Sequence, residues 1–123
     1  MKDQSCKTPR WKMLKAQLNN LLPETFMARM NTQENPIIID VRTAEEFATG
    51  HIDQARNINY FADDFWEQLE QLDADQPIFV YCRTGRRSIR ACTLMRNGGF
   101  NNDLIFNLEG GYNLWLKEMS TNV

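Results

Sequence analysis

Two short apolar runs constrain the fold of this chain more than any other feature. Residues 36–41 read Pro-Ile-Ile-Ile-Asp-Val, and residues 77–81 read Pro-Ile-Phe-Val-Tyr. Runs in which apolar residues follow one another without alternating with polar ones are typical of strands buried on both faces of a parallel sheet. Apolar residues at helical spacing follow each run. Strands that alternate with helices in this way predict an α/β domain with a parallel sheet.

Weaker patterns complete the expected fold. Further short strands are expected within residues 16–21, 55–58 and 104–106, which gives a central parallel sheet of about five strands. Five helices are expected after the N-terminal region. One begins at Pro23, and a second follows a capping box formed by Thr43 and Glu46. Two more span residues 61–72 and 88–96, and the last follows Gly111. With helices on both faces of the sheet, a site is expected at the carboxyl ends of the strands.

The length and charge of the chain favour a single domain. Its 123 residues, of which 42% are hydrophobic and 24% charged, suffice for one ordinary core. We expect residues 1–15 to form an N-terminal extension with a short helix after Pro9. The domain is expected over residues 16–119, followed by a C-terminal tail at residues 120–123. A net charge of −2 argues against a general nucleic-acid partner.

The cysteines and the N-terminal residues predict a cytoplasmic protein. Cys6, Cys82 and Cys92 are an odd number without the spacing of a disulfide framework, which fits a reducing compartment. Residues 1–22 carry several basic residues and no continuous apolar stretch. Neither a typical secretory signal nor a membrane span is therefore expected, and no membrane partner. A monomer is the default oligomeric state.

One cysteine stands where a strand is expected to turn into a helix. Cys82 follows the apolar run that ends at Tyr81. The residues after it are Arg83, Thr84, Gly85, Arg86, Arg87 and Ser88. At such a turn successive backbone N–H groups can point into one small concave site, and the positive end of the helix adds to their attraction for an anion. A thiolate, which is the nucleophilic form of cysteine, is stabilised in this setting.

The residues around Cys82 fit a nucleophile that acts on an anionic substrate. Gly85 supplies the backbone freedom that a tight loop needs. The loop arginines can donate paired hydrogen bonds to a sulfonate, phosphate or carboxylate, and on a mildly acidic protein they concentrate small anions. The alternative is a buried structural cysteine beside a solvated basic patch. The expected strand and helix on either side favour the nucleophile.

Four segments together resemble the rhodanese family, in its single-domain, thiosulfate sulfurtransferase-like form. They are residues 39–47, with Ile-Asp-Val-Arg and Glu-Glu-Phe, residues 50–58, with Gly-His-Ile and Ala-Arg-Asn-Ile, residues 82–88, and residues 108–115, with Leu-Glu-Gly-Gly-Tyr and Trp. Their order and spacing make the resemblance specific. One departure is Gln54, which stands where the family usually has glycine. We expect Gln54 to affect the geometry of a surface turn and not the chemistry.

The resemblance implies a rhodanese-like three-layer domain and a sulfur-transfer reaction. The thiolate of Cys82 attacks the outer sulfur of thiosulfate or of a persulfide donor, and a persulfide forms on Cys82. A thiophilic acceptor then takes this sulfur; the acceptor is cyanide in vitro, or a cellular thiol or thiol protein. The residues from Arg83 to Ser88 hold the persulfide and bind the anionic donor. Asp40 and Arg42, at the neighbouring strand end, either brace this loop or form a structural ion pair.

Two other functions are weighed as alternatives. Related cell-cycle dual-specificity phosphatases have five residues between cysteine and arginine, whereas four residues separate Cys82 from Arg87. Tyr81 stands where those enzymes have histidine, and the shorter loop suits a sulfur atom better than a phosphoryl group. Non-catalytic rhodanese-like docking modules commonly lose the cysteine that this chain keeps. Sulfur transfer is therefore the preferred hypothesis.

Other chemistries have little support in the sequence. His51 is the single histidine, and it fits a structural residue of a turn better than a base. One histidine and no paired cysteines predict no metal site. The chain has neither a G-x-G-x-x-G motif nor a Walker loop, so no cofactor is expected. Cys92 fits a small core residue, and Cys6 is a weak candidate for a second sulfur acceptor.

Overall fold

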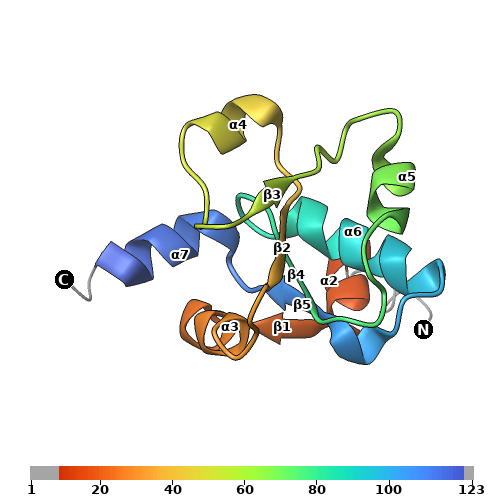
Figure 1. The fold of residues 1–123 in the computed structure, drawn as a ribbon, viewed down its shortest axis with the longest axis horizontal. Helices are drawn as coiled ribbons and strands as arrows, with labels where there is room; N and C mark the ends of the chain where they lie inside the picture. Colours follow the sequence, from red (N-terminus) through yellow and green to blue (C-terminus); the bar gives the residue numbers. More distant parts are fainter. Residues whose placement is uncertain (1–8, 121–123) are drawn as a thin grey trace.

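Five parallel strands form one sheet at the centre of the molecule (Figure 1). The structure, a computed structural model, describes residues 9–120. The strands are β1 (Asn19–Leu21), β2 (Ile37–Asp40), β3 (Arg56–Asn57), β4 (Ile78–Tyr81) and β5 (Ile105–Leu108). Their order in the sheet is β1-β5-β4-β2-β3, and all neighbouring strands run parallel. The predicted parallel sheet of about five strands is confirmed.

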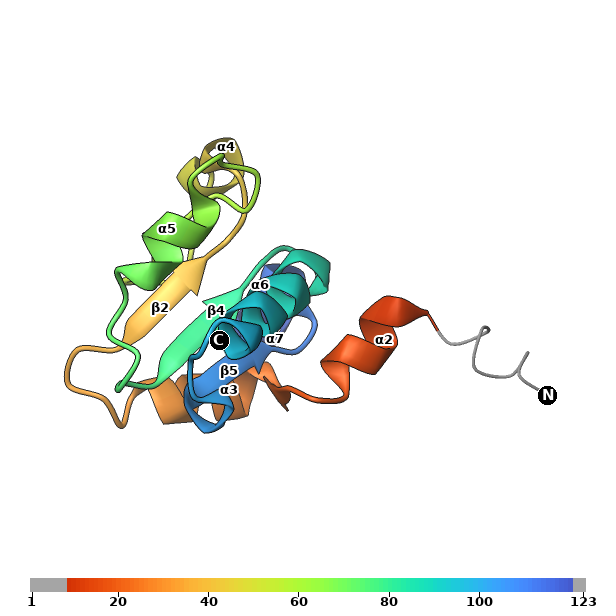
Figure 2. The ribbon, with the colours of Figure 1, turned by 90° about the vertical axis from the view of Figure 1, so that its right-hand side faces the viewer.

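Helices cover both faces of this sheet. They are α2 (Arg10–Lys15), α3 (Pro23–Met30), α4 (Ala44–Ala48), α5 (Phe65–Glu70), α6 (Arg86–Asn97) and α7 (Gly111–Ser120), with a 3-10 turn η1 (Asn102–Leu104). Helices α2, α5 and α6 lie on one face and α3 and α7 on the other, which gives three layers (Figures 1 and 2). Within residues 9–120, no helix is both long and apolar enough to cross a membrane.

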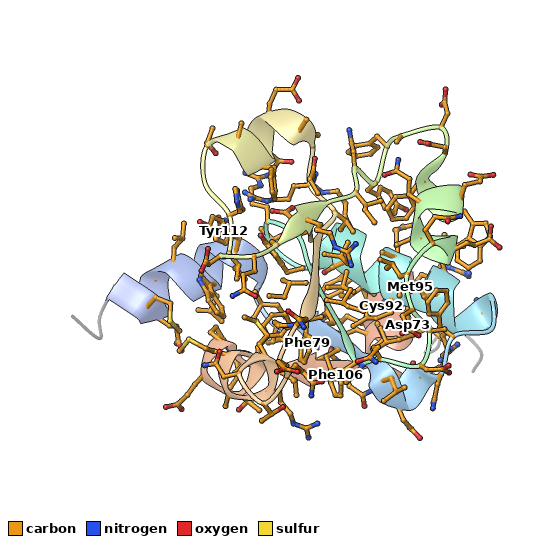
Figure 3. The ribbon with its side chains drawn as sticks, in the orientation of Figure 1. Asp73, Phe79, Cys92, Met95, Phe106 and Tyr112 are labelled. Atoms are coloured by element: carbon orange, nitrogen blue, oxygen red, sulfur yellow. The ribbon has the colours of Figure 1, made fainter. Side chains whose placement is uncertain are left out.

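Alternate residues of the strands fill two cores, one on each face of the sheet. Ile39 belongs to the core beneath α5 and α6, and its neighbour Ile38 belongs to the core beneath α3 and α7. In the second core, Phe79 and Phe106 stack with their ring centroids 5.4 Å apart (Figure 3). Cys92 projects from α6 into the first core and is fully buried, which confirms its expected place there (Figure 3). Because both faces are covered, the central strand β4 is apolar throughout.

Local sequence signals set the ends of the helices. The hydroxyl of Thr43 accepts a hydrogen bond from the N–H of Glu46 at 3.2 Å, and the N–H of Thr43 donates to the Glu46 carboxylate at 2.9 Å. The predicted capping box of α4 is therefore confirmed. Helix α6 begins at Arg86, before the expected start at residue 88, because Gly85 takes a left-handed φ of 114° directly in front of it.

The helix predicted over residues 61–72 is shorter in the structure. It begins only at Phe65, and the side chain of Phe61 is 65% exposed. The side chain of Asn59 accepts a hydrogen bond from the N–H of Phe61 at 2.9 Å, and asparagine turns of this kind compete with helix formation. The prediction that this helix begins at residue 61 is therefore wrong.

The turn at Gln54 offers a simple test of backbone strain. Gln54 has a left-handed φ of 72° and an exposed side chain, as expected for a surface turn. We expect Gln54→Gly to raise the free energy of unfolding by about 0.5–1 kcal/mol in urea, because glycine adopts this conformation without a steric cost. The control is Gln71→Gly, since Gln71 is exposed but has φ −76°. Glycine should lower the stability there, and a similar effect at both positions would refute the strain argument.

Candidate active site

The thiol of Cys82 lies in the turn between β4 and α6. The backbone N–H of Gly85 donates a hydrogen bond to Sγ of Cys82 at 3.0 Å, and the N–H of Ser88 donates a second at 3.4 Å. The thiol donates to the hydroxyl of Ser88 at 3.5 Å, and that hydroxyl donates to the carbonyl of Gly85. Ser88 lies in the first turn of α6, where the helix leaves N–H groups unpaired. The sulfur is therefore enclosed by donors that favour an anion.

The first turn of α7 holds this loop in place from outside. The N–H of Tyr112 donates to the carbonyl of Cys82 at 2.8 Å, and the N–H of Asn113 donates to the carbonyl of Arg83 at 3.1 Å. Gly111 makes the approach possible, because a Cβ at this position would lie 2.4 Å from the carbonyl oxygen of Arg83. Since C=O and N–H point in opposite directions in a trans peptide, the N–H groups that follow these two carbonyls point away from α7.

The three arginines of the loop take different positions, although their closeness in the sequence suggests a single cluster of positive charge. The guanidinium of Arg87 makes two hydrogen bonds to the carboxylate of Glu46, at 2.8 and 3.1 Å. Nε of Arg83 lies 3.9 Å from the same carboxylate, with the side chain 62% exposed. Arg86 lies on the other side of the loop, with its guanidinium 4.1 Å from the ring centroid of Trp11. The positive charges around Cys82 are therefore not equivalent.

Glu46 connects the helix cap of α4 to the Cys82 loop. The sequence predicts no role for it beyond the capping box, but its carboxylate accepts hydrogen bonds from both Thr43 and Arg87. The hydrogen bond from Arg87 lowers the pKa of Glu46 to about 2. No local pattern marks this contact, because the two residues are 41 positions apart. Glu46 is the partner that fixes the orientation of Arg87.

The ion pair of Glu46 predicts a dependence of stability on pH. Because the pKa of Glu46 is lowered in the folded protein from its usual value of about 4.3, the pair contributes fully above about pH 5 and is lost as the pH falls towards 2. In the wild type, the free energy of unfolding falls as the pH drops from about 5 to 2. We expect this decrease to be smaller by about 1–2 kcal/mol in Glu46→Gln, as measured by urea denaturation. Glu45→Gln, at an exposed neighbouring position, should retain the wild-type slope. Equal slopes for all three proteins would contradict this role.

Asp40 and Arg42 form a buried ion pair at the carboxyl end of β2. Nη2 of Arg42 donates to the Asp40 carboxylate at 2.7 Å, and Nε of Arg42 donates to it at 3.0 Å. The side chain of Arg42 is 5% exposed and that of Asp40 is 0% exposed. Arg42 also donates to the carbonyl of Gly50 at 2.6 Å and lies over the ring of Tyr112, which Figure 3 places at the start of α7. Within the described part of the chain, no hydrogen bond joins the pair to residues 82–88. The pair therefore meets the loop through Tyr112, whose N–H donates to the carbonyl of Cys82.

The remaining predicted residues lie away from the sulfur. His51 stacks on Phe47, and its Nδ1 lies 3.0 Å from the carbonyl oxygen of Phe47, which agrees with a structural role in the turn. Cys92 is enclosed in the core, where burial raises the pKa of its thiol. Cys6 lies outside the described residues. The structure thus leaves Cys82 as the candidate nucleophile among the cysteines it describes.

Comparison with known proteins identifies the family. The Rhodanese-like domain family matches residues 22–118, which is most of the chain. The chain belongs to this family. The match includes strands β2 to β5, the Cys82 loop and most of α7, whereas helix α2 and strand β1 precede it. The resemblance noted in the sequence is therefore confirmed, and the rhodanese-like fold with it.

Individual relatives of this rhodanese-like chain agree with the family. The chain is 34% identical over 94 residues to thiosulfate sulfurtransferase GlpE of Stutzerimonas stutzeri, covering 76% of this chain and 80% of that protein. It is 36% identical over 88 residues to the Arabidopsis thaliana protein HIGH ARSENIC CONTENT 1, mitochondrial, covering 63% of this chain and 51% of that protein, so it spans about half of the plant protein. The solved polysulfide-sulfur transferase homodimer from Wolinella succinogenes has a TM-score of 0.72 and 26% identity, over 89% of this chain and 81% of that one. The two bacterial relatives indicate a sulfurtransferase.

Proposed function

We propose that this rhodanese-like protein carries sulfane sulfur as a persulfide on Cys82. The observation that carries the proposal is the placement of the Cys82 thiol, with the N–H groups of Gly85 and Ser88 directed at its sulfur. This arrangement stabilises a thiolate before the reaction and an anionic persulfide after it. The named sulfurtransferase relatives support the class of reaction.

The reaction has two half-reactions. In the first, the thiolate of Cys82 attacks the outer sulfur of thiosulfate; a new S–S bond forms at Cys82, the S–S bond of thiosulfate breaks, and sulfite leaves with the electron pair. A persulfide donor reacts in the same way and releases its thiolate. In the second, a thiophilic acceptor attacks the outer sulfur of the persulfide and restores the Cys82 thiolate. The acceptor is cyanide in vitro, or a small thiol or thiol protein in the cell.

The other residues of the loop support these steps. Ser88 places a hydroxyl next to the sulfur, and Arg87, held by Glu46, fixes the loop at the start of α6. The cationic side chains of Arg83 and Arg86 attract the anionic donor. A reducing compartment such as the cytoplasm suits the free thiols of Cys82 and Cys92, and we place the activity there.

Mass spectrometry of the intact protein tests the proposal directly. After incubation with thiosulfate and removal of the excess, we expect a mass gain equal to one sulfur atom, located on the peptide that contains Cys82. Cyanide should remove this sulfur as thiocyanate. A folded protein that gains no mass would contradict the proposal and favour the docking module. Phosphotyrosine, offered to the same preparation, should release no phosphate, and its hydrolysis would favour the phosphatase.

A further inference from the structure

A cavity of about 270 Å³ lies beside the Cys82 loop, on the side of helix α2. Gly85 and Arg86 line it from the loop, and Trp11 and Lys15 line it from α2. Gly85 also donates its N–H to the sulfur of Cys82, so the cavity and the thiol share one stretch of backbone. Helix α2 precedes residues 22–118, the part that matches the rhodanese-like family. One wall of this cavity therefore comes from outside the matched domain.

Arg86 carries the unpaired positive charge of this cavity. Within the described residues it makes no ion pair, whereas Arg87 and Arg83 share the carboxylate of Glu46. The other two charged residues that line the cavity, Lys15 and Glu109, neutralise each other at 2.7 Å. The guanidinium of Arg86 is therefore the group of the loop that is available for an anion here.

Trp11 fixes the position of this guanidinium. Its ring centroid lies 4.1 Å from the central carbon of the Arg86 guanidinium, and stacking of this kind orients the group while its N–H donors stay free. Trp11 itself packs against the core beneath α6. Lys15 ties the end of α2 to Glu109, just beyond β5. The ring therefore has a fixed place relative to the loop.

We propose that this cavity binds the anionic end of the sulfur donor, a small sulfur oxoanion of the thiosulfate type. Arg86 contacts the oxoanion, and Trp11 is a positioning residue that acts through Arg86. The proposal rests on the proposed function, since it assigns the donor subsite of the same reaction. It also makes helix α2 part of the site, although this helix precedes the family match.

Steady-state kinetics with thiosulfate, at saturating cyanide, test the contact of Arg86. We expect Arg86→Gln to raise KM for thiosulfate about tenfold or more, with kcat changed less than about twofold, because a charge-assisted contact to the donor is lost. The matched control is Arg90→Gln, an exposed arginine on α6 that does not line this cavity. It should leave KM unchanged. An equal rise in both variants, or a rise in Arg83→Gln alone, overturns the assignment.

A double-mutant cycle tests the role of Trp11. We expect Trp11→Ala to raise KM for thiosulfate about two- to fivefold, and Trp11→Phe to restore most of the wild-type value, since it retains an aromatic face. In the Arg86→Gln background, Trp11→Ala should raise KM no further. A further rise there would show that Trp11 acts through the general stability of α2, and it would overturn the positioning role.

The two proposals fail in different ways. Wild-type protein that gains no sulfur from thiosulfate contradicts the proposed function itself. Wild-type protein that gains sulfur on Cys82, together with an Arg86→Gln variant of unchanged KM, contradicts only the subsite. The intact-mass measurement on wild type therefore comes first, and the kinetics of the variants follow.

Discussion

Cys82→Ser is expected to abolish the uptake of sulfur from thiosulfate, with a fall in rate on the order of 10³-fold or more. A serine hydroxyl at this position cannot form a persulfide, and it is a poor nucleophile towards sulfur. The fold should persist, because the smaller hydroxyl can accept the hydrogen bonds that Gly85 and Ser88 donate to the sulfur. The measurements are the rate of thiocyanate formation and the mass of the protein after incubation with thiosulfate.

The second buried thiol provides the control. Cys92→Ala removes a cysteine that is 0% exposed in the core, on the same helix that follows the Cys82 loop. This variant should still gain one sulfur atom, with at most a modest loss of stability. Sulfur uptake by Cys82→Ser, or its absence from a folded Cys92→Ala, would show that the nucleophile has been assigned to the wrong residue.

Asp40→Asn is expected to lower the free energy of unfolding by about 3 kcal/mol or more at neutral pH. The substitution removes the charge opposite Arg42, which is only 4% exposed and donates to Asp40 through Nε and Nη2. A guanidinium left in this place keeps its desolvation cost without a compensating carboxylate. Urea denaturation followed by circular dichroism measures the loss.

An exposed carboxylate on a neighbouring turn gives the comparison for this substitution. Asp53→Asn changes an exposed side chain and should alter the unfolding free energy by less than about 0.5 kcal/mol. A similarly small effect of Asp40→Asn would mean that the site relaxes around Arg42, for example by admitting water. The pair would then contribute little to holding the end of β2.

The architecture could be predicted because two strands at the middle of the sheet carry a strong signal in the sequence. The run of β4 is apolar throughout and that of β2 is apolar up to Asp40, and both strands have neighbours on either side in the sheet, where both faces are covered. Thr43 and Glu46 likewise specify the start of α4 within four residues. The helix predicted over residues 61–72 is too long, because the spacing of apolar residues indicates a helical face but gives no sign of the turn at Asn59.

The candidate site could be predicted only in part, because its polar contacts are long-range. The places of Cys82 and Gly85 can be predicted, because the strand, the loop and the helix around them adjoin one another in the sequence. The different roles of the arginines do not, since Arg87 is oriented by Glu46 and Arg86 by Trp11, from segments far away in the chain. Neither partner belongs to a motif that includes the loop. Such pairings become visible only when the segments are placed in space.

The bonds between the Cys82 loop and α7 also bear on how the protein is synthesised. The N–H groups that donate to the carbonyls of Cys82 and Arg83 belong to residues made about thirty positions after the cysteine. On the ribosome this is a stretch comparable in length to a βαβ unit. Until Gly111 and the two residues after it have left the exit tunnel, these carbonyls lack their native donors. The loop around Cys82 therefore lacks two of its native hydrogen bonds until this late segment of the chain is available.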